Sequence, residues 1–273
     1  MIDVSESFDE IGHVVYNDFD KGLIGNHIIH IYDFKNVNSK WLFYYILKNQ
    51  LSFRSISYGD KVASLKISDI SQININLPPL YEQKKIIEII KPLEDMIDNL
   101  NNIKETTLKF IDSLPVKNTG KYIKFKSIQT GRHNANFETP NGKYPFYTCG
   151  IKIRKCSSYS FDGRYIILSG NASLYTWWID GKFDLYQRVY ALLPHNNFFT
   201  SYHSVRNAMR KLRDESSGSV IKYITLGDIE KIELLDNSYE EKLSKLYKIV
   251  SSAERILDDI DNIKNMLIKL LIK

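Results

Sequence analysis

The sequence predicts two similar halves, each a compact domain that combines strands with a short helix and ends in a long helix. Two heptad patterns recur in the same phase 160 positions apart. A related segment precedes each pattern, so the similarity extends beyond the helices. The 273 residues suffice for two modest domains with separate cores.

The long helices are predicted from apolar residues that lie alternately four and three positions apart, the spacing of a coiled-coil contact. The polar interruption falls at Lys104 in the first series and at Lys264 in the second. A helix that only covered a core would explain one such series, but not two in the same phase. We therefore expect the two helices to be equivalent and to pack on each other. The expected seam contains Ile90, Leu93, Ile97, Leu100, Ile111, Val250, Leu257, Ile260 and Leu267.

Prolines set the limits of the first helix. Pro78 and Pro79 exclude helix before it, and Pro115 follows its end. Pro92 lies inside the heptad pattern and is expected to kink the helix or to divide it into a short and a long segment.

The two halves also match upstream of the helices. The matching segments are 59–70 with 218–229, 41–47 with 200–206, and 24–32 with 185–193. They predict a short apolar helix at 41–47 and a short strand-like stretch before each long helix. The halves are unequal, because the first has no counterpart to roughly the first half of the second globular part, which runs from about residue 117 to 236.

Charge is weakly informative as a total and more informative in its distribution. The net charge is +5 and the pI is near 8.9, which is compatible with a polyanionic partner. Lysine and arginine concentrate between residues 117 and 213, where acids are few and aromatic residues are interleaved. The alternative interpretation is a β-rich core with solvated lysines, and composition alone favours neither.

Several classes of protein lack support in the sequence. No apolar run reaches the length of a membrane span, and the polar, acidic N-terminus does not resemble a secretory signal, so we expect a cytoplasmic protein without a membrane partner. Cys149 and Cys156 are too few for a disulfide framework, and the six histidines show no metal-ligand spacing. No nucleotide-binding glycine motif and no nucleophile motif occurs. A self-contained nuclease or methyltransferase is therefore disfavoured.

One segment carries a family resemblance. Residues 55–83 resemble the end of a target-recognition domain in the specificity subunits of Type I restriction-modification systems, with the signature Leu77-Pro-Pro-Leu-Tyr-Glu-Gln83. Residues 141–148 and 165–170 resemble two strand motifs of the same domain, and residues 180–183 resemble the turn that follows them. The second half departs from the pattern, because residues 235–239 contain no double proline.

The resemblance implies an α+β protein with target-recognition domains and two long antiparallel, coiled-coil-like helices. It implies four segments: a partial first target-recognition domain (1–79), a first conserved helix (80–115), a complete second domain (116–237) and a second conserved helix (238–273). It also implies a non-catalytic subunit that reads double-stranded DNA and docks modification (methyltransferase) subunits beside a restriction subunit. Adenine methylation and ATP-dependent DNA cleavage would belong to the whole complex. S-adenosylmethionine, ATP and Mg would be held by the partner subunits alone.

A second hypothesis is a truncated interaction module. Such a protein would dimerise or dock the methyltransferase without reading a two-part site independently, and a homodimer is one form it could take. Selective binding to duplex DNA would separate the two hypotheses.

Candidate DNA contacts follow from loop position and side-chain chemistry. Arginine can pair with guanine and asparagine with adenine, which favours residues 131–136. Residues 154–155 are expected in a second basic turn, residues 169–171 in a polar turn after a strand, and the arginines and lysine of 206–213 along a helix suited to phosphates. The candidates are Arg132, His133, Asn134, Asn136, Arg154, Lys155, Asn171, Arg206, Arg210, Lys211 and Arg213. Trp177 and Trp178 are expected to pack in the core.

Overall fold

The computed structural model contains both helices and sheets, which confirms the α+β class. The chain divides into two compact units: unit 1 contains residues 1–106 and 251–273, and unit 2 contains residues 107–250. The structure describes residues 2–3, 5–6, 12–17, 28–29, 31, 35–49, 55–58, 63–171, 173–214 and 223–272. His27 and His30 lie outside these ranges.

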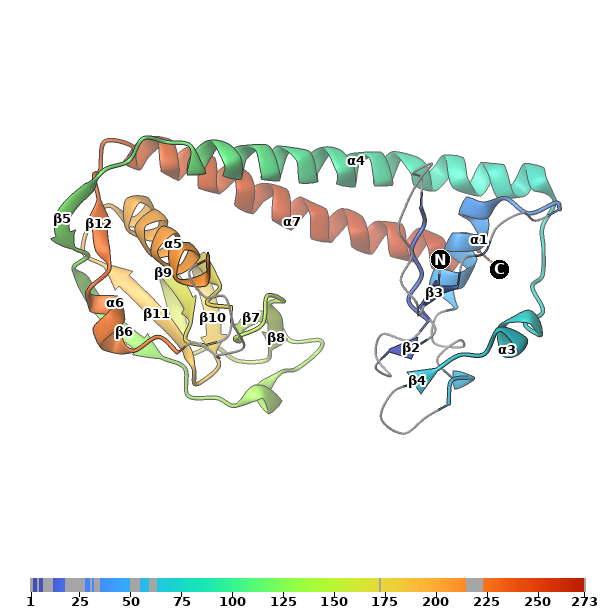
Figure 1. Cartoon of the computed structure of the whole chain (residues 1–273), viewed down its shortest axis with the longest axis horizontal. Helices are drawn as coiled ribbons and strands as arrows, with labels where there is room; N and C mark the ends of the chain where they lie inside the picture. Colours follow the sequence, from blue (N-terminus) through green and yellow to red (C-terminus); the bar gives the residue numbers. More distant parts are fainter. Residues whose placement is uncertain are drawn as a thin grey trace. The chain divides into compact units, whose positions relative to one another are not determined.

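Two long helices contribute to both units: α4 (Leu80–Asp112) and α7 (Glu240–Leu271) (Figure 1). Their first residues lie at or near the boundaries expected from the sequence. We expected Pro92 to kink the first helix or to divide it; α4 is continuous through Pro92, so the helix is not divided, and a kink stays a prediction. Pro92 is exposed, so the Glu88 carbonyl that loses its intrahelical donor can bind water instead.

The helices are antiparallel inside each unit. In unit 1, Ile90 of α4 and Ile268 of α7 are buried in one cluster. Fourteen residues further along α4, Lys104 lies near Glu254, where burial raises the carboxyl pKa and the lysine opposes the shift. In unit 2, Ile111 shares a core with residues 243–250 of α7. Contacting residues thus have increasing numbers along α4 and decreasing numbers along α7.

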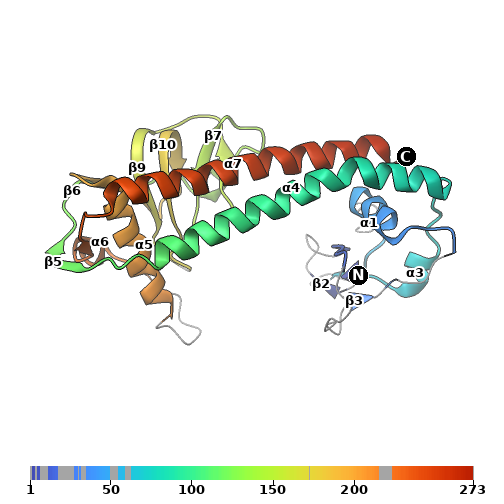
Figure 2. The same cartoon turned by 90° about the horizontal axis from the view of Figure 1, so that it is seen from above.

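Unit 1 has a small apolar core built on a short helix. Trp41 and Tyr44 of α1 are fully buried and pack in the cluster of Ile90 and Ile268, and Figure 2 shows α1 beside the long helices. The helix confirms the expectation for residues 41–47. The elements outside α4 and α7 are β1 (Ile2–Asp3), β2 (Ser5–Glu6), β3 (Ile28–Ile29), α1 (Ser39–Lys48), β4 (Ala63–Ser64) and α3 (Ile67–Ser71). β1 pairs with β3 and β2 with β4, both antiparallel.

Unit 2 contains a six-stranded sheet in the order β6-β11-β9-β10-β7-β8 and a separate pair, β12-β5. The pairs are antiparallel except for β7 with β10. The elements are β5 (Asn118–Tyr122), β6 (Phe125–Thr130), η1 (Ala135–Phe137), β7 (Tyr144–Tyr147), β8 (Arg154–Cys156), β9 (Phe161–Ser169), β10 (Thr176–Leu185), β11 (Val189–Pro194), α5 (Phe198–Asp214), α6 (Leu226–Glu230) and β12 (Glu233–Leu235).

The strands test three of the sequence assignments. β7 and β9 confirm the strand motifs at 141–148 and 165–170. The turn expected at 180–183 is wrong, because these residues lie inside β10. Gly181 of β10 pairs with Gly163 of β9, and both have positive φ, which only glycine adopts easily. The two glycines therefore allow β9 and β10 to continue as one long hairpin, whereas the Asp180-Gly181 dipeptide suggested a turn at this point.

The internal repeat also appears in the short elements. α3 and α6 are five-residue helices that precede α4 and α7. The stretch after α6 forms β12, but residues 73–79 after α3 form no strand, so the strand expected there is wrong. Trp178 packs edge-on against Phe199 of the unit 2 core, 5.1 Å between ring centroids, and Trp177 packs near Tyr147. Both tryptophans lie at the core, as expected.

Candidate nucleic-acid interface and helix surfaces

The segment that follows β6 is held against the turn between β10 and β11. The Gly131 N–H donates to the Val189 carbonyl at 3.1 Å, and the Gln187 N–H donates to the His133 carbonyl at 2.8 Å. A Cβ at Gly131 would collide with the Leu185 carbonyl, so the close approach needs glycine. Residues 131–136 are thus fixed at their base.

The His133 ring lies between an aromatic ring and a buried carboxylate. The ring stacks on Phe137, 3.5 Å between centroids, and its Nε2 lies 3.6 Å from Asp184 Oδ2. Asp184 is buried and also accepts from the Ser160 hydroxyl and the Leu185 N–H, both at 2.7 Å. Burial and then the Asp184 charge raise the pKa of Cys156 to about 11, so this thiol stays protonated at neutral pH.

Exposed guanidinium and amide side chains lie beside His133. Arg132, Asn134 and Asn136 are exposed, although the Asn134 side-chain oxygen already accepts the Asn136 N–H at 3.0 Å. Arg154 and Lys155 are exposed on β8, a strand and not the basic turn we expected. An ion pair between Arg154 and Glu138, and a bond from the Thr139 N–H to the Lys155 carbonyl at 2.8 Å, join β8 to the loop.

The structure thus brings together six sequence-predicted residues in one surface. We call it the reading surface: Arg132, His133, Asn134, Asn136, Arg154 and Lys155. Two further exposed residues adjoin it through the turn between β10 and β11, namely Gln187 and Arg188. Sequence reasoning did not select them, although an amide and a guanidinium side by side between two apolar runs were a usable signal.

The remaining candidates lie elsewhere in unit 2, on or near α5. Arg206 and Arg210 form ion pairs with Asp112 of α4. Arg213 donates to the Ser173 and Leu174 carbonyls at 3.1 Å, and Asn171 forms a bridge with Tyr223. Lys211 is exposed. A role in phosphate binding stays a prediction for this group, and for Arg206 and Arg210 it would compete with an internal carboxylate.

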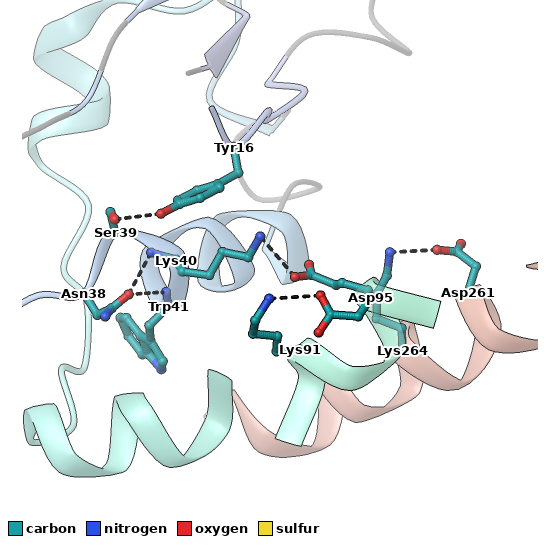
Figure 3. A network of polar contacts seen from close by, with 10 residues as sticks. Tyr16, Asn38, Ser39, Lys40, Trp41, Lys91, Asp95, Asp261 and Lys264 are labelled. Atoms are coloured by element: carbon teal, nitrogen blue, oxygen red, sulfur yellow. Dashed lines mark hydrogen bonds and ion pairs between the residues drawn. The ribbon is translucent and has the colours of Figure 1, made fainter. Parts of the chain in front are cut away.

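In unit 1, the last residue of the sequence signature anchors the helix. The Gln83 side chain is fully buried. Its Oε1 accepts the Asn38 N–H at 2.7 Å, and its Nε2 donates to the Asn36 and Pro78 carbonyls at 3.0 and 2.8 Å. The Asn38 side chain in turn caps α1 by accepting from Lys40 and Trp41 (Figure 3). One amide thereby ties the start of α4 to the start of α1.

One ion pair between α1 and α4 supports the same junction. Lys40 of α1 pairs with Glu94 of α4 at 3.0 Å, and its ammonium lies 4.3 Å from the centre of the Tyr16 ring. Figure 3 shows Lys40 and Tyr16 with the Lys91–Asp95 pair of α4 and the Lys264–Asp261 pair of α7.

In unit 2 a different residue joins the starts of the two corresponding helices. The Glu240 carboxylate, at the start of α7, accepts the Phe199 and Thr200 N–H groups at the start of α5, at 3.1 and 2.7 Å. A carboxylate satisfies the unpaired donors of a helix N-terminus and favours its dipole. The second half lacks the double-proline signature. In its place, a charge-assisted cap joins α7 to α5, as Gln83 joins α4 to α1.

The expected seam residues of α4 and α7 lie on the sides that face inward. Ile90, Ile111, Val250 and Ile260 are buried, and the other five are half-buried. This burial is what a seam requires, and the individual pairings across it stay a prediction.

A second apolar stripe on the same helices is exposed. In unit 1 each of its residues directly precedes a seam position and lies seven residues from the next on the same helix, and their exposed fractions run from 40% to 72%. We call these residues the outer stripe: Ile89, Met96, Ile103, Ile256, Ile263 and Leu270. In unit 2, Phe110 and Ile249 continue the spacing and are also exposed.

The geometry of the helix pair puts the two halves of the outer stripe on one side of unit 1. The helices are antiparallel and the stripe has the same heptad position in both, so a twofold between them relates the two rows. The opposite side of the pair is covered, because Ile87 and Ile268 pack in the cluster of α1. The outer stripe is therefore an unpartnered apolar surface within the described residues.

The described residues support neither a metal site nor a membrane span. Among the described residues, no three histidine, cysteine, aspartate or glutamate side chains gather as metal ligands would. No helix in the same ranges is both long and apolar enough to cross a bilayer.

Comparison with known proteins assigns the family. The model of the Type I restriction modification DNA specificity domain matches residues 2–108 and 124–235, so the chain belongs to this family. The two matches follow the internal repeat: the first extends into α4, and the second ends before α7 begins.

Individual relatives agree with this assignment. The Type I restriction enzyme EcoDI specificity subunit of Escherichia coli is 34% identical over 153 residues, which cover 53% of this chain and 33% of that protein. The chain thus matches about a third of the length of this curated relative. The S subunit of the Type I restriction-modification system of M. genitalium aligns with a TM-score of 0.52 and 19% identity, covering 87% of this chain and 73% of that one. This likeness supports the fold.

Proposed function

We propose that the chain is a DNA sequence-recognition and scaffold subunit of a Type I restriction-modification complex. Unit 2 reads duplex DNA, and the paired helices hold modification subunits. The observation that carries the DNA-reading role is the reading surface, where exposed guanidinium, ammonium and amide groups surround a loop held at its base by backbone hydrogen bonds to the turn between β10 and β11.

The chemistry of the reading surface suits a major groove. Guanidinium groups of Arg132 and Arg154 match the two acceptors of guanine, and the Asn136 amide matches the donor and acceptor of adenine. A fixed loop base lowers the entropy lost when these side chains are ordered on DNA. Arg154 would exchange its ion pair with Glu138 for a base or a phosphate, so its net contribution is smaller than its contacts suggest.

Selection from a randomised duplex pool tests this role. The chain is mixed with a Type I modification subunit, and bound sequences are determined for the wild type, for Asn136→Ala and for the control Asn237→Ala. Asn237 is also exposed in unit 2 but lies beside α7. We expect Asn136→Ala to relax one position of the selected sequence, worth about 1–3 kcal/mol of discrimination, and the control to change none. A selected sequence that is identical in all three proteins contradicts the assignment.

The outer stripe supports the docking role. Three of the four residues that flank Met96 and Ile263 on the outer face are uncharged, namely Pro92, Asn99 and Met266, and the fourth is the exposed Asp259. Depletion of charge around exposed apolar residues is typical of the centre of a protein interface.

A matched pair of substitutions tests the docking role. Met96→Glu with Ile263→Glu places two charges in the outer stripe. Asn102→Glu with Asn262→Glu places the same charges at exposed positions on another face of the same helices. We expect the first pair to weaken binding of the modification subunit at least about a hundredfold, as for buried unpaired charges, and the second to leave it within a few-fold. Equal binding by both pairs would remove the stripe from the interface.

The interaction-module hypothesis makes a different forecast for the same experiments. It expects a complex with the modification subunit, or a homodimer, that shows no sequence selection. Salt-sensitive binding without any selected sequence would favour it over the DNA-reading role.

The chemistry of the complex would lie outside this chain. We assign S-adenosylmethionine, ATP and Mg to the modification and restriction subunits, together with adenine methylation and ATP-dependent cleavage, and we place the assembly in the cytoplasm. Methylation or cleavage by the isolated chain would overturn this assignment.

A further inference from the structure

Residues 73–77, which join α3 to α4, differ from their counterpart in unit 2 in the bonding of the backbone. In unit 2 the counterpart includes β12, which pairs with β5. The pair is extended at both ends, because the Ile123 N–H donates to the Ile232 carbonyl at 2.9 Å and the Asp236 N–H donates to the Lys117 carbonyl at 2.8 Å. In the described part of unit 1, no backbone hydrogen bond joins residues 74–77 to another strand.

The equivalence of the two segments rests on their neighbours. Each follows a five-residue helix and precedes a long one. With an offset of 159 residues, Asp69 aligns with Asp228, Ile70 with Ile229, and Ile73 with Ile232. Residues 74–77 therefore correspond to the part of unit 2 that is bonded to β5.

The open edge lies beside an apolar cavity. A cavity of about 370 Å³ in unit 1 is lined by aliphatic side chains that include Leu42, Ile46, Ile70, Ile73, Ile75 and Leu77. In unit 2 the residue after β5, Ile123, is 5% exposed and belongs to the same core as Ile229 and Ile232. The cavity thus adjoins Ile70 and Ile73. Their counterparts in unit 2, Ile229 and Ile232, share a core with the residue that follows β5.

The edge has none of the usual protection against strand pairing. Natural edge strands commonly carry lysine, inward charges or a bulge. Here the outward residues are Asn74 and Asn76, which are exposed and uncharged, while Ile73 and Ile75 are half-buried. Alternation of apolar and polar residues is the pattern of a strand with one covered face.

We propose that residues 73–77 accept an extended strand from a second polypeptide, which places an aliphatic side chain in the cavity. Main-chain bonds supply the affinity of such strand addition and the pocket supplies the register. The fitting partner is an uncharged or weakly basic segment with one large aliphatic residue at its inward end, in the manner of residues 116–123. The β5 strand of another copy does not qualify, because it is already paired with β12 of its own unit.

Hydrogen exchange on the intact chain tests this proposal with a peptide probe. The probe is a synthetic peptide with the sequence of residues 113–124, added at about 1 mM, where weak strand addition is still detectable. We expect exchange at residues 73–77 to slow about tenfold at saturation. The control peptide carries Ile123→Asp, which keeps the backbone donors and removes the aliphatic side chain.

A second variant tests the edge itself. Leu77 aligns with Asp236, whose N–H bonds to Lys117, and Leu77→Pro removes the matching donor without a change inside α4. We expect the variant to bind the wild-type peptide at least about tenfold more weakly.

Three results would overturn the proposal. The first is no protection of residues 73–77 by the wild-type peptide. The second is equal protection by the Ile123→Asp peptide. The third is slow exchange of these residues in the free chain, which would mean that the edge is already paired.

Discussion

The Nδ1 atom of His203 lies 2.7 Å from the hydroxyl oxygen of Tyr247 and joins α5 to α7 inside unit 2. Both side chains are buried. Burial, and then the positive charge of Arg206, lower the pKa of His203 to about 4. Burial also raises the pKa of Tyr247 above its usual value. The pair therefore stays neutral across physiological pH and acts as a hydrogen-bonded part of the core.

The lowered pKa of His203 predicts a pH dependence of stability. The unfolded chain binds a proton near the ordinary value of 6.5, whereas the folded chain binds it only near 4. The contribution is thus fully present above pH 6.5 and is lost as the pH falls toward 4. We expect about 2 kcal/mol of the free energy of unfolding to disappear between pH 7 and pH 5. Urea unfolding at a series of pH values measures it.

The variant His203→Gln isolates this effect. Glutamine keeps a polar group near Tyr247 and does not titrate. The variant should be less stable than the wild type at pH 7 and should lose much less stability on going to pH 5. Parallel pH curves for the two proteins would show that another group is responsible.

Gln83 predicts a local loss of stability in unit 1. Its counterpart in the second half, Leu243, is also fully buried, so Gln83→Leu changes polarity more than volume. The substitution leaves the Asn38 N–H and the Asn36 and Pro78 carbonyls without their partner. We expect a cost of about 1–3 kcal/mol, measured as faster hydrogen exchange in α1. The exposed neighbour Lys84→Leu serves as the control and should leave exchange in α1 unchanged.

The features that could be predicted from the sequence are those with a period. The heptads identified α4 and α7, and the repeat identified α3 and α6 as equivalents, because a regular backbone imposes a regular side-chain pattern. Residues 180–183 were misassigned because Asp-Gly is among the strongest turn signals, and the signal does not reveal that Gly163 lies opposite.

Contacts between distant residues were the part that the sequence could not supply. Nothing near Arg206 indicates Asp112, which lies 94 residues away. The role of Gln83 was hidden for the same reason, since two of its three partners, Asn38 and Asn36, lie 45 and 47 residues away in the sequence. Part of the reading surface could be predicted from the sequence. Loop position and side-chain type suffice to select Arg132 and Asn136 as candidates, and no tertiary contact has to be known. Gln187 was missed because its place beside His133 depends on a tertiary hydrogen bond.

The seam predicts that charges on its two helices break their pairing in unit 1. Ile97→Asp and Leu257→Asp each put a carboxylate at a half-buried seam position. We expect each to lower the free energy of unfolding by about 3 kcal/mol, from lost apolar burial and an uncompensated charge. Asn102→Asp, at an exposed position of α4, should change it by less than about 0.5 kcal/mol. Melting curves that are the same for all three variants would count against the seam.

Lys211 and Arg206 predict opposite outcomes, although both are basic residues of α5. Lys211 is exposed, and a lysine that neutralises one phosphate contributes about 0.9 to the slope of log K against log salt concentration. Lys211→Gln should therefore lower that slope by about one and leave the unfolding free energy unchanged. Arg206→Gln should instead leave Asp112 with a weakened partner and lower the unfolding free energy by about 1–3 kcal/mol. DNA binding across a salt series, paired with urea unfolding of both variants, separates the two roles. If Arg206→Gln changes the salt slope and keeps full stability, its guanidinium binds phosphate in preference to Asp112, and the assignment of α5 must be reversed.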